Sequence, residues 1–499
     1  MSAHHQPNPP AFDLRGAARE SMTEHGFEPV FPPEVEHEVA ELAANPPRMN
    51  VSAVDLRHLL WSSIDNDTSR DLDQIEYAEE VPNGSVKVLI GIADVDLYAP
   101  KGSALDRHAA TETVTIYAGI EIFPMLPEEL STGWTSLLED EDRASIVTEF
   151  VVDPQDNVNS IRIYPAIVRN KAQLAYSGTG AWLDGRAPAP AKVAASAELQ
   201  AQLKLQNDVA QRLRGERYKR GALNIETIET QSIVRGADIE IEAQQRNAAT
   251  DLIEDFMIAA NGAVARTLRE KRISSIRRIV RTPRRWDRIV QLAAGMGTKL
   301  PEQPDSKALN DFLCRQKEED PDHFADLSLA VVKLLGPGEY VLERPGDTPQ
   351  GHFGLAIEDY THSTAPNRRY ADLVTQRLVK AMIAGERSPY SDEELAAIAA
   401  NCTAKAAAER KLERQMQKRI AAVALHNRIG DIFRAIVTGV LDRGTFVRTI
   451  NPHVDGMLVH GQQGVDVGDE LTVKLLRTDP VHGFIDFTRV LPGGVPTNG

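Results

Sequence analysis

Residues 64–75 read Ile-Asp-Asn-Asp-Thr-Ser-Arg-Asp-Leu-Asp-Gln-Ile, and this density of carboxylates in a short segment is the most informative feature of the chain. Mg2+ prefers carboxylate oxygens and keeps its other positions for water and substrate phosphate. Asp71 and Asp73 are two residues apart, so an extended segment points both to one side, and Asp65 reaches them from the preceding turn. The spacing indicates a magnesium site, with a solvated acidic loop as the alternative.

A second segment, 352–370, places two histidines, two tyrosines and the pair Arg368-Arg369 in a stretch punctuated by glycine and proline. The planar, permanently charged fork of arginine suits a phosphate oxygen or a developing negative charge. We therefore expect a phosphate-binding loop. The alternative is an arginine pair that opens an amphipathic helix over 371–383.

Together the two segments resemble the signature motifs of the ribonuclease II (RNB) family, exoribonucleases that hydrolyse single-stranded RNA from its 3′ end. Further matching segments follow in the family's order at 92–95, 102–106, 116–117, 123–131 and 252–261. The resemblance covers roughly 49–424. It implies cleavage in the 3′-to-5′ direction that yields 5′-mononucleotides.

By this resemblance Asp65, Asp71 and Asp73 match the family's catalytic and metal-binding carboxylates, and Arg368 matches the arginine that assists cleavage. The expected cofactor is Mg2+, as one ion or two, with Mn2+ as a substitute. A cation held by clustered aspartates activates water and stabilises the leaving 3′ oxygen, while an arginine neutralises charge in the transition state.

RNA contacts are also expected from the resemblance and from charge. Tyr117 matches the aromatic residue on which the terminal base stacks, although core packing is the usual role of a lone tyrosine. Glu254, or its neighbour Asp255, matches a residue that contacts ribose, with a helix-surface carboxylate as the alternative. The remaining expected RNA-binding residues of the catalytic domain are Tyr176, Arg369 and Arg278, the last from a basic stretch over 266–288.

One position departs from the family pattern, because Gln74 stands where relatives carry the last aspartate of the acidic motif. An amide oxygen still coordinates a cation, though more weakly than a carboxylate, so Gln74 is expected as a weakened metal ligand. Asp67 is an extra carboxylate nearby. The leading hypothesis is an active exoribonuclease; the alternative is an RNA-binding protein with weak or no hydrolysis, and a phosphoesterase acting on small substrates ranks below both.

The C-terminal segment reads as five short alternating strands between 436 and 487, separated by Gly, Asp and Pro turns. Five such strands suit an OB barrel, and the segment resembles an S1 domain. Phe446 and His460 fall where that barrel contacts RNA, with a core position as the alternative for Phe446.

The N-terminus shows helical spacing over 12–25 and 33–44, joined by a breaker rich in Gly and Pro. Two short helices fit a module resembling a helix-turn-helix, which either contacts nucleic acid or packs onto the catalytic domain. By the family resemblance, this module is expected to take the place of the cold-shock domains that are common in relatives.

The whole chain is therefore expected to be a multidomain α+β protein. Its expected parts are a helical module over 1–48, an RNB catalytic domain with a mixed sheet and surrounding helices over 49–425, and an S1 barrel over 433–492. The net charge of -16 argues against nucleic-acid binding only on average, because basic residues cluster locally. Two distant cysteines and no apolar spanning segment predict a cytoplasmic protein without disulfides, expected to act as a monomer on single-stranded RNA.

Overall fold

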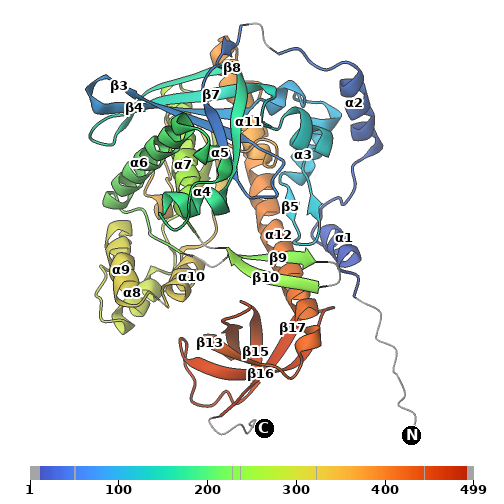
Figure 1. Cartoon of the computed structure of the whole chain (residues 1–499), viewed down its shortest axis with the longest axis vertical. Coiled ribbons are helices and arrows are strands. Elements are labelled where there is room, and N and C mark those ends of the chain that lie inside the picture. The colour runs from blue at the N-terminus through green and yellow to red at the C-terminus, as the bar shows by residue number, and fades with distance from the viewer. Residues whose placement is uncertain are drawn as a thin grey trace.

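The computed structural model describes residues 12–49, 52–226, 229–235, 238–244, 246–321, 323–442 and 444–491. A six-stranded mixed sheet has the order β1-β8-β2-β3-β4-β7, and Figure 1 shows its strands β3, β4, β7 and β8 in the upper part of the molecule. Because β8 also pairs with β7, the strands β8-β2-β3-β4-β7 form a ring of pairings. The strands are β1 (Val54–Asp55), β2 (Trp61–Asp65), β3 (Gln74–Val81), β4 (Ser85–Ala93), β7 (Asp142–Val152) and β8 (Val158–Ala175).

Alternate residues of these strands enter two separate hydrophobic cores, because successive side chains of a strand point to opposite faces. Ile75 on β3 belongs to a core shared with α3 (Ala104–Glu112), α11 (Tyr370–Ala384) and α12 (Asp392–Ala424). Ala78, also on β3, belongs to a core shared with α6 (Ala197–Lys219) and α7 (Ala248–Glu270). Helices therefore cover both faces, and the acidic segment 66–73 leaves the sheet between β2 and β3.

Local signals explain where the long helices begin and end. Capping boxes start α7 at Asn247 and α12 at Ser391, where the cap side chain and the N3 side chain satisfy backbone N–H groups reciprocally. Gly385 ends α11 in the left-handed conformation that glycine adopts without strain. The shorter helices around this framework are α4 (Tyr176–Leu183), α5 (Ala191–Ala194), α8 (Trp286–Gly295), α9 (Ser306–Glu319) and α10 (Phe324–Leu335). Two hairpins join β5 (Ile116–Tyr117) with β6 (Ile122–Phe123) and β9 (Glu229–Arg235) with β10 (Asp238–Gln244). A further two-stranded antiparallel sheet pairs β11 (Ser275–Ile279) with β12 (Glu339–Glu343), which are distant in sequence.

The C-terminal segment forms a closed barrel with the order β13-β14-β15-β17-β16, at the end of α12 (Figure 1). Its interior is filled by alternating side chains that include Phe433, Leu458 and Phe487. The five predicted strands and the mixed α+β architecture are thus confirmed. The strands are β13 (Ile432–Leu441), β14 (Gly444–Thr449), β15 (Asp455–His460), β16 (Glu470–Asp479) and β17 (Phe484–Arg489).

The two predicted N-terminal helices are present as α1 (Leu14–Glu24) and α2 (Pro33–Ala44). They pack on different parts of the catalytic domain: α1 contacts α12, and α2 contacts α3. Their buried residues also belong to different cores, Met22 to one and Val35 to another. This arrangement supports the packing interpretation, and contact with nucleic acid stays a prediction.

Within the described part of the chain, none of the helices is both long and apolar enough to cross a lipid bilayer.

Candidate active site

The two signature segments meet at Asp73, which lies at the end of the acidic segment just before β3. One carboxylate oxygen of Asp73 accepts the backbone N–H of Asn367 at 3.1 Å, and the other accepts Nε–H of Arg368 at 3.4 Å. Asp73 is only 1% exposed, whereas the side chain of Arg368 is 44% exposed. An arginine that is fixed on a buried carboxylate and still reaches solvent is placed to meet a phosphate.

Burial sets the electrostatics of the carboxylates. It raises the pKa of Asp73 to about 7, against the opposing influence of Arg368, and Asp71 raises it further. Burial also raises the pKa of Asp71, while Arg368 lowers it and Asp65 raises it. Asp65 therefore lies close enough to disfavour the charged form of Asp71, and Asp71 close enough to disfavour that of Asp73, and a bound cation would relieve both effects.

The aspartate side chains are of the type that binds a divalent cation, but they are not close enough together to form a coordination site. Hard carboxylate oxygens are the ligands that Mg2+ prefers. Yet no group of three or more Asp, Glu, His or Cys side chains in the described residues is close enough together to hold a metal ion. Asp65 accepts hydrogen bonds from Ser69 Oγ at 2.8 Å and from the N–H of Asn66 at 2.7 Å. A bound cation would draw these carboxylates together in place of such local contacts.

Gln74 stays a prediction as a metal ligand, whereas Asp67 has a partner of its own. Gln74 is buried as the first residue of β3. The carboxylate of Asp67 accepts the hydroxyl of Ser177 at 3.0 Å, on α4, so the extra acid is engaged away from Asp73.

Tyr117 adjoins the carboxylates from the short strand β5. Its hydroxyl donates to Asp71 Oδ2 at 3.3 Å, and its backbone N–H donates to Glu413 Oε1 at 3.2 Å. The residue is 40% exposed, while its neighbours Ile116 and Ala118 are buried. The core-packing alternative therefore fails for Tyr117, and its exposed ring beside the acidic segment suits stacking of a base.

Tyr176 and Glu254, two further expected RNA-binding residues, differ in their burial and in their contacts. Tyr176 begins α4 and is half-buried, and burial raises the pKa of its hydroxyl, with Asp65 and Glu76 acting in the same direction. It therefore lies near the acidic segment. Glu254 on α7 forms an ion pair with Arg246. Both Tyr176 and Glu254 stay predictions as RNA contacts.

Arg369 and Arg278 are occupied by internal partners. Arg369 holds Asp372 with two nitrogens, at 2.8 and 2.7 Å, and Asp372 also accepts the N–H groups of Thr364 and Ala365. This cluster fixes the loop that carries Arg368. Arg278 lies over the ring of Tyr340, 4.7 Å from its centre. Their expected contacts with RNA are not tested by these interactions.

On the barrel, Phe446 is half-buried between the buried residues Thr445 and Val447, so it faces outward on β14. His460 ends β15 and is exposed. Both positions are compatible with the predicted RNA contacts.

Sequence reasoning missed two residues near the site. Glu413 on α12 fixes the backbone of Tyr117; its only signal is an acid within the basic stretch 405–419 of that helix. Glu76 on β3 is fully buried with both carboxylate oxygens unpartnered, and burial raises its pKa well above the usual value, with Asp65 adding to the effect. The sequence gives little signal of it, because Glu76 is one of three glutamates in β3 and only Glu76 is buried.

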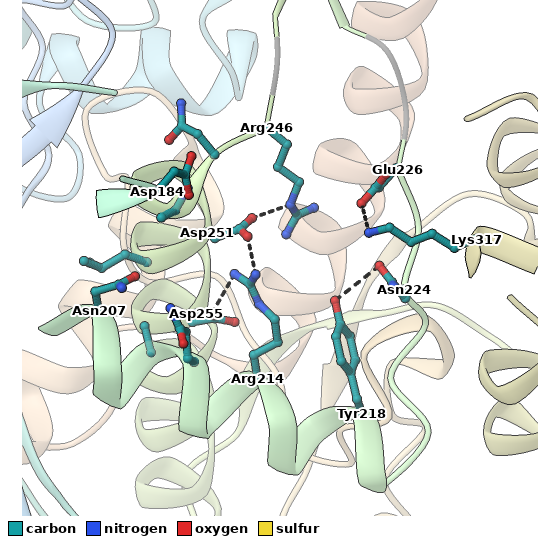
Figure 2. Close-up of a pocket in the computed structure, with 15 residues that line it drawn as sticks. Asp184, Asn207, Arg214, Tyr218, Asn224, Glu226, Arg246, Asp251, Asp255 and Lys317 are labelled. Atoms are coloured by element: carbon teal, nitrogen blue, oxygen red, sulfur yellow. Dashed lines mark hydrogen bonds and ion pairs between the residues drawn. The ribbon is translucent and has the colours of Figure 1, made fainter. Parts of the chain in front are cut away.

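A polar cavity of about 360 Å3 lies between α6, α7 and the segments that flank them. Figure 2 shows Asp251 between Arg214 and Arg246, and it forms ion pairs with both. Arg214 also pairs with Asp255 at 2.7 Å. The charged side chains that line this cavity form ion pairs within the protein, and no residue of the acidic segment lines it.

Comparison with known proteins gives a consistent assignment. The RNB domain model matches residues 53–385, and the model of the RNase II-type exonuclease C-terminal S1 domain matches 431–490. Ribonuclease R of Thermotoga maritima is 30% identical, over 92% of this chain and 68% of the relative. Ribonuclease R of Escherichia coli is 29% identical, over 88% of this chain and 55% of the relative, so the chain spans little more than half of that protein.

Solved structures agree on the fold. Mycoplasma genitalium RNase R, solved without ligand and in complex with ribose-methylated single-stranded RNA, matches with a TM-score of 0.83 and 23% identity over 96% of this chain and 78% of that one. The yeast pseudonuclease Ssd1 matches with a TM-score of 0.71 and 16% identity over 98% of this chain and 59% of that one. From the matching RNB and S1 models and the Thermotoga relative, it follows that the chain belongs to the RNB family of exoribonucleases and carries its C-terminal S1 domain.

Proposed function

We propose that the protein is a hydrolytic exoribonuclease that degrades single-stranded RNA from its 3′ end and releases 5′-mononucleotides with the help of Mg2+. The observation that carries this proposal is the contact of Asp73 with Asn367 and Arg368, beside the exposed ring of Tyr117. A base platform, a solvent-accessible arginine and clustered carboxylates are the parts that phosphodiester hydrolysis at a chain end needs.

Each part has a separate task. Stacking on Tyr117 holds the terminal base without selecting its identity, because every base has a π face. Arg368, whose Nε is held by Asp73, directs its remaining donors to the scissile phosphate and stabilises the charge that develops there. Asp65, Asp71 and Asp73 would hold Mg2+, which when bound lowers the pKa of the attacking water and polarises the phosphate.

A second candidate is an RNA-binding protein of the same fold with little hydrolysis. It is favoured by Gln74, which offers a neutral oxygen where the family has a carboxylate, and by the absence of a ready-made group of three ligands among the described residues. Either protein would hold single-stranded RNA between the catalytic domain and the S1 barrel.

A time course on 5′-labelled single-stranded RNA separates the two candidates. We expect shortening that depends on Mg2+, ends at a short limit product and is lost in Asp73→Asn. Gln74→Asp is the informative second variant. RNA that stays intact with the natural chain, is shortened by Gln74→Asp and is bound by both would establish the binding protein instead.

A further inference from the structure

The strand that carries Tyr117 is too small to hold its own position. The β5–β6 hairpin pairs only Ile116 with Phe123 and Tyr117 with Ile122. An isolated two-stranded hairpin is at best marginally stable in water, so this one depends on its surroundings. The N–H of Thr115 donates to the carbonyl of Arg368 at 3.0 Å, and that of Tyr117 donates to Glu413. The rest of the support comes from side-chain packing. Ile122 is exposed, and the ring of Tyr117 faces the site.

The hairpin packs on α12, in a core that the N-terminal helix completes. Ile116, Ala118 and Phe123 share one core with α1 and α12. The residues that α1 and its following turn contribute to this core, all buried, are Leu14, Ala18, Met22 and Phe27. Because side chains alternate along a strand, the residues on either side of Tyr117 point into the core formed with α1 and α12, while Tyr117 points at the carboxylates.

Polar contacts tie α1 to the same two elements. Arg19 of α1 forms an ion pair with Glu121 in the hairpin turn at 2.9 Å. Ser21 donates to Gln415 of α12 at 3.3 Å, and the buried Arg419 of α12 donates to the carbonyl of Ala17 at 3.4 Å. The turn approaches α12 closely, since a Cβ on Gly119 would lie 2.8 Å from Ile420.

We infer that α1 is a positioning element for the base platform: it clamps the β5–β6 hairpin on α12 and so fixes Tyr117 over the carboxylates. This rests on the proposed function only in taking Tyr117 as the contact of the 3′-terminal base. The N-terminal helix acts on RNA through the protein, without touching the RNA itself.

The test compares two variants of α1 with a control in α2. Arg19→Gln removes the ion pair from a side chain that is 56% exposed, so folding is not endangered; Arg19→Lys restores the charge. Met22→Ala opens a cavity in the shared core. Val35→Ala is the matched control, because Val35 is equally buried in the same N-terminal segment but belongs to the other core.

Three readouts are needed. Amide hydrogen exchange of residues 116–123 is measured without RNA; we expect faster exchange in Arg19→Gln and Met22→Ala, and no change in Val35→Ala or Arg19→Lys. Removing the Tyr117 ring should raise KM about tenfold, so a partial loss of stacking in Met22→Ala should raise KM about threefold, with kcat nearly unchanged. Quenching of a fluorescent 3′-terminal base should weaken in parallel.

The decisive step is a double mutant. In a Tyr117→Ala background, Met22→Ala should cause no further rise in KM, because the platform it positions is gone. An equal rise in that background would mean that α1 contacts RNA directly, and an equal effect of Val35→Ala would mean general destabilisation; either overturns the inference. If the protein binds or cleaves no RNA at all, the proposed function fails, while unchanged exchange over 116–123 refutes the clamp alone.

Discussion

Replacing Asp73 by Asn should abolish activity and at the same time stabilise the metal-free protein. Burial raises the pKa of Asp73 from 3.8 to about 7, so the folded state binds this proton more tightly than the unfolded chain does. The Asp73 carboxyl therefore contributes to the free energy of unfolding at low pH. This contribution is lost as the pH rises from about 4 to about 7 and does not return at higher pH. Asn has the same shape and carries no charge at any pH.

The size of the effect follows from the pKa. Each pKa unit corresponds to about 1.4 kcal/mol, so moving from 3.8 to about 7 makes the ionised carboxylate cost about 4 kcal/mol at pH 8. Asn keeps an oxygen that accepts the N–H of Asn367 but has no second acceptor for Arg368. The lost hydrogen bond reduces the expected stabilisation by about 1–2 kcal/mol. We expect Asp73→Asn to raise the free energy of unfolding by about 2–3 kcal/mol at pH 8.

Urea unfolding with EDTA, at pH 8 and pH 5, measures this directly. The gain should shrink at pH 5, where the natural carboxyl is largely protonated. Asp372→Asn is the control, because Asp372 is equally buried but forms an ion pair with Arg369. This variant should have a free energy of unfolding about 3–5 kcal/mol lower than that of the natural protein. Adding Mg2+ should stabilise the natural protein more than Asp73→Asn. An Asp73→Asn protein that is less stable than the natural one at pH 8 would refute the reasoning.

Four further outcomes are expected. Tyr117→Ala should raise KM for RNA about tenfold while Tyr117→Phe, which keeps the ring, stays near normal in steady-state kinetics. Arg368→Lys should lower kcat about 100-fold or more, because the ammonium cannot both pair with Asp73 and reach the phosphate. A Lys variant with a normal kcat would contradict this role of Arg368. Gln74→Asp should tighten Mg2+ binding about tenfold in calorimetry. Glu76→Leu should raise the free energy of unfolding by about 1–3 kcal/mol at pH 8, since two unpartnered buried oxygens are removed, and a loss would show that Glu76 has a partner such as a cation.

The chemistry of the site could be anticipated from sequence because its residue types are unusual in combination. A segment rich in aspartate and a loop with paired arginines have few common uses, and the structure brings them together at Asp73 and Arg368. The exposure of Tyr117 followed less directly. Its buried neighbours alternate with it, but two residues are too few to recognise as a strand from sequence.

The partners of charged residues could not be anticipated. Arg369 and Arg368 are adjacent, yet one is held by Asp372 and the other reaches solvent. The basic stretch over 266–288, which suggested Arg278 as an RNA contact, is divided between α7, β11 and α8. Within it Arg277 is buried in an ion pair with Glu343 at 2.9 Å, because the strand turns alternate residues inward. Charge counting along the chain does not resolve such alternation.

Helical periodicity predicted α1 and α2 but not the elements against which they pack. An apolar stripe shows that one face of a helix is buried, but it does not identify the element that buries it. Glu76 was missed for a related reason. A carboxylate in a strand is normally placed on a solvated face, whereas here α6 covers that face of the sheet and leaves the side chain buried. Both outcomes depend on contacts between segments that are distant in sequence.

The helix α11 explains how the fold tolerates an unfavourable carboxylate at its centre. Behind the loop that carries Arg368, α11 presents Arg377 to Asp106 at 2.6 Å and Lys380 to Asp94 at 2.8 Å. Together with the Arg369–Asp372 pair these contacts anchor the loop through hydrogen-bonded charges, whose loss would be costly once they are buried. The backbone that presents Asn367 and Arg368 to Asp73 is thus fixed independently of Asp73. Asp73 can therefore carry a destabilising charge that serves cation binding, which is why its replacement should separate activity from stability.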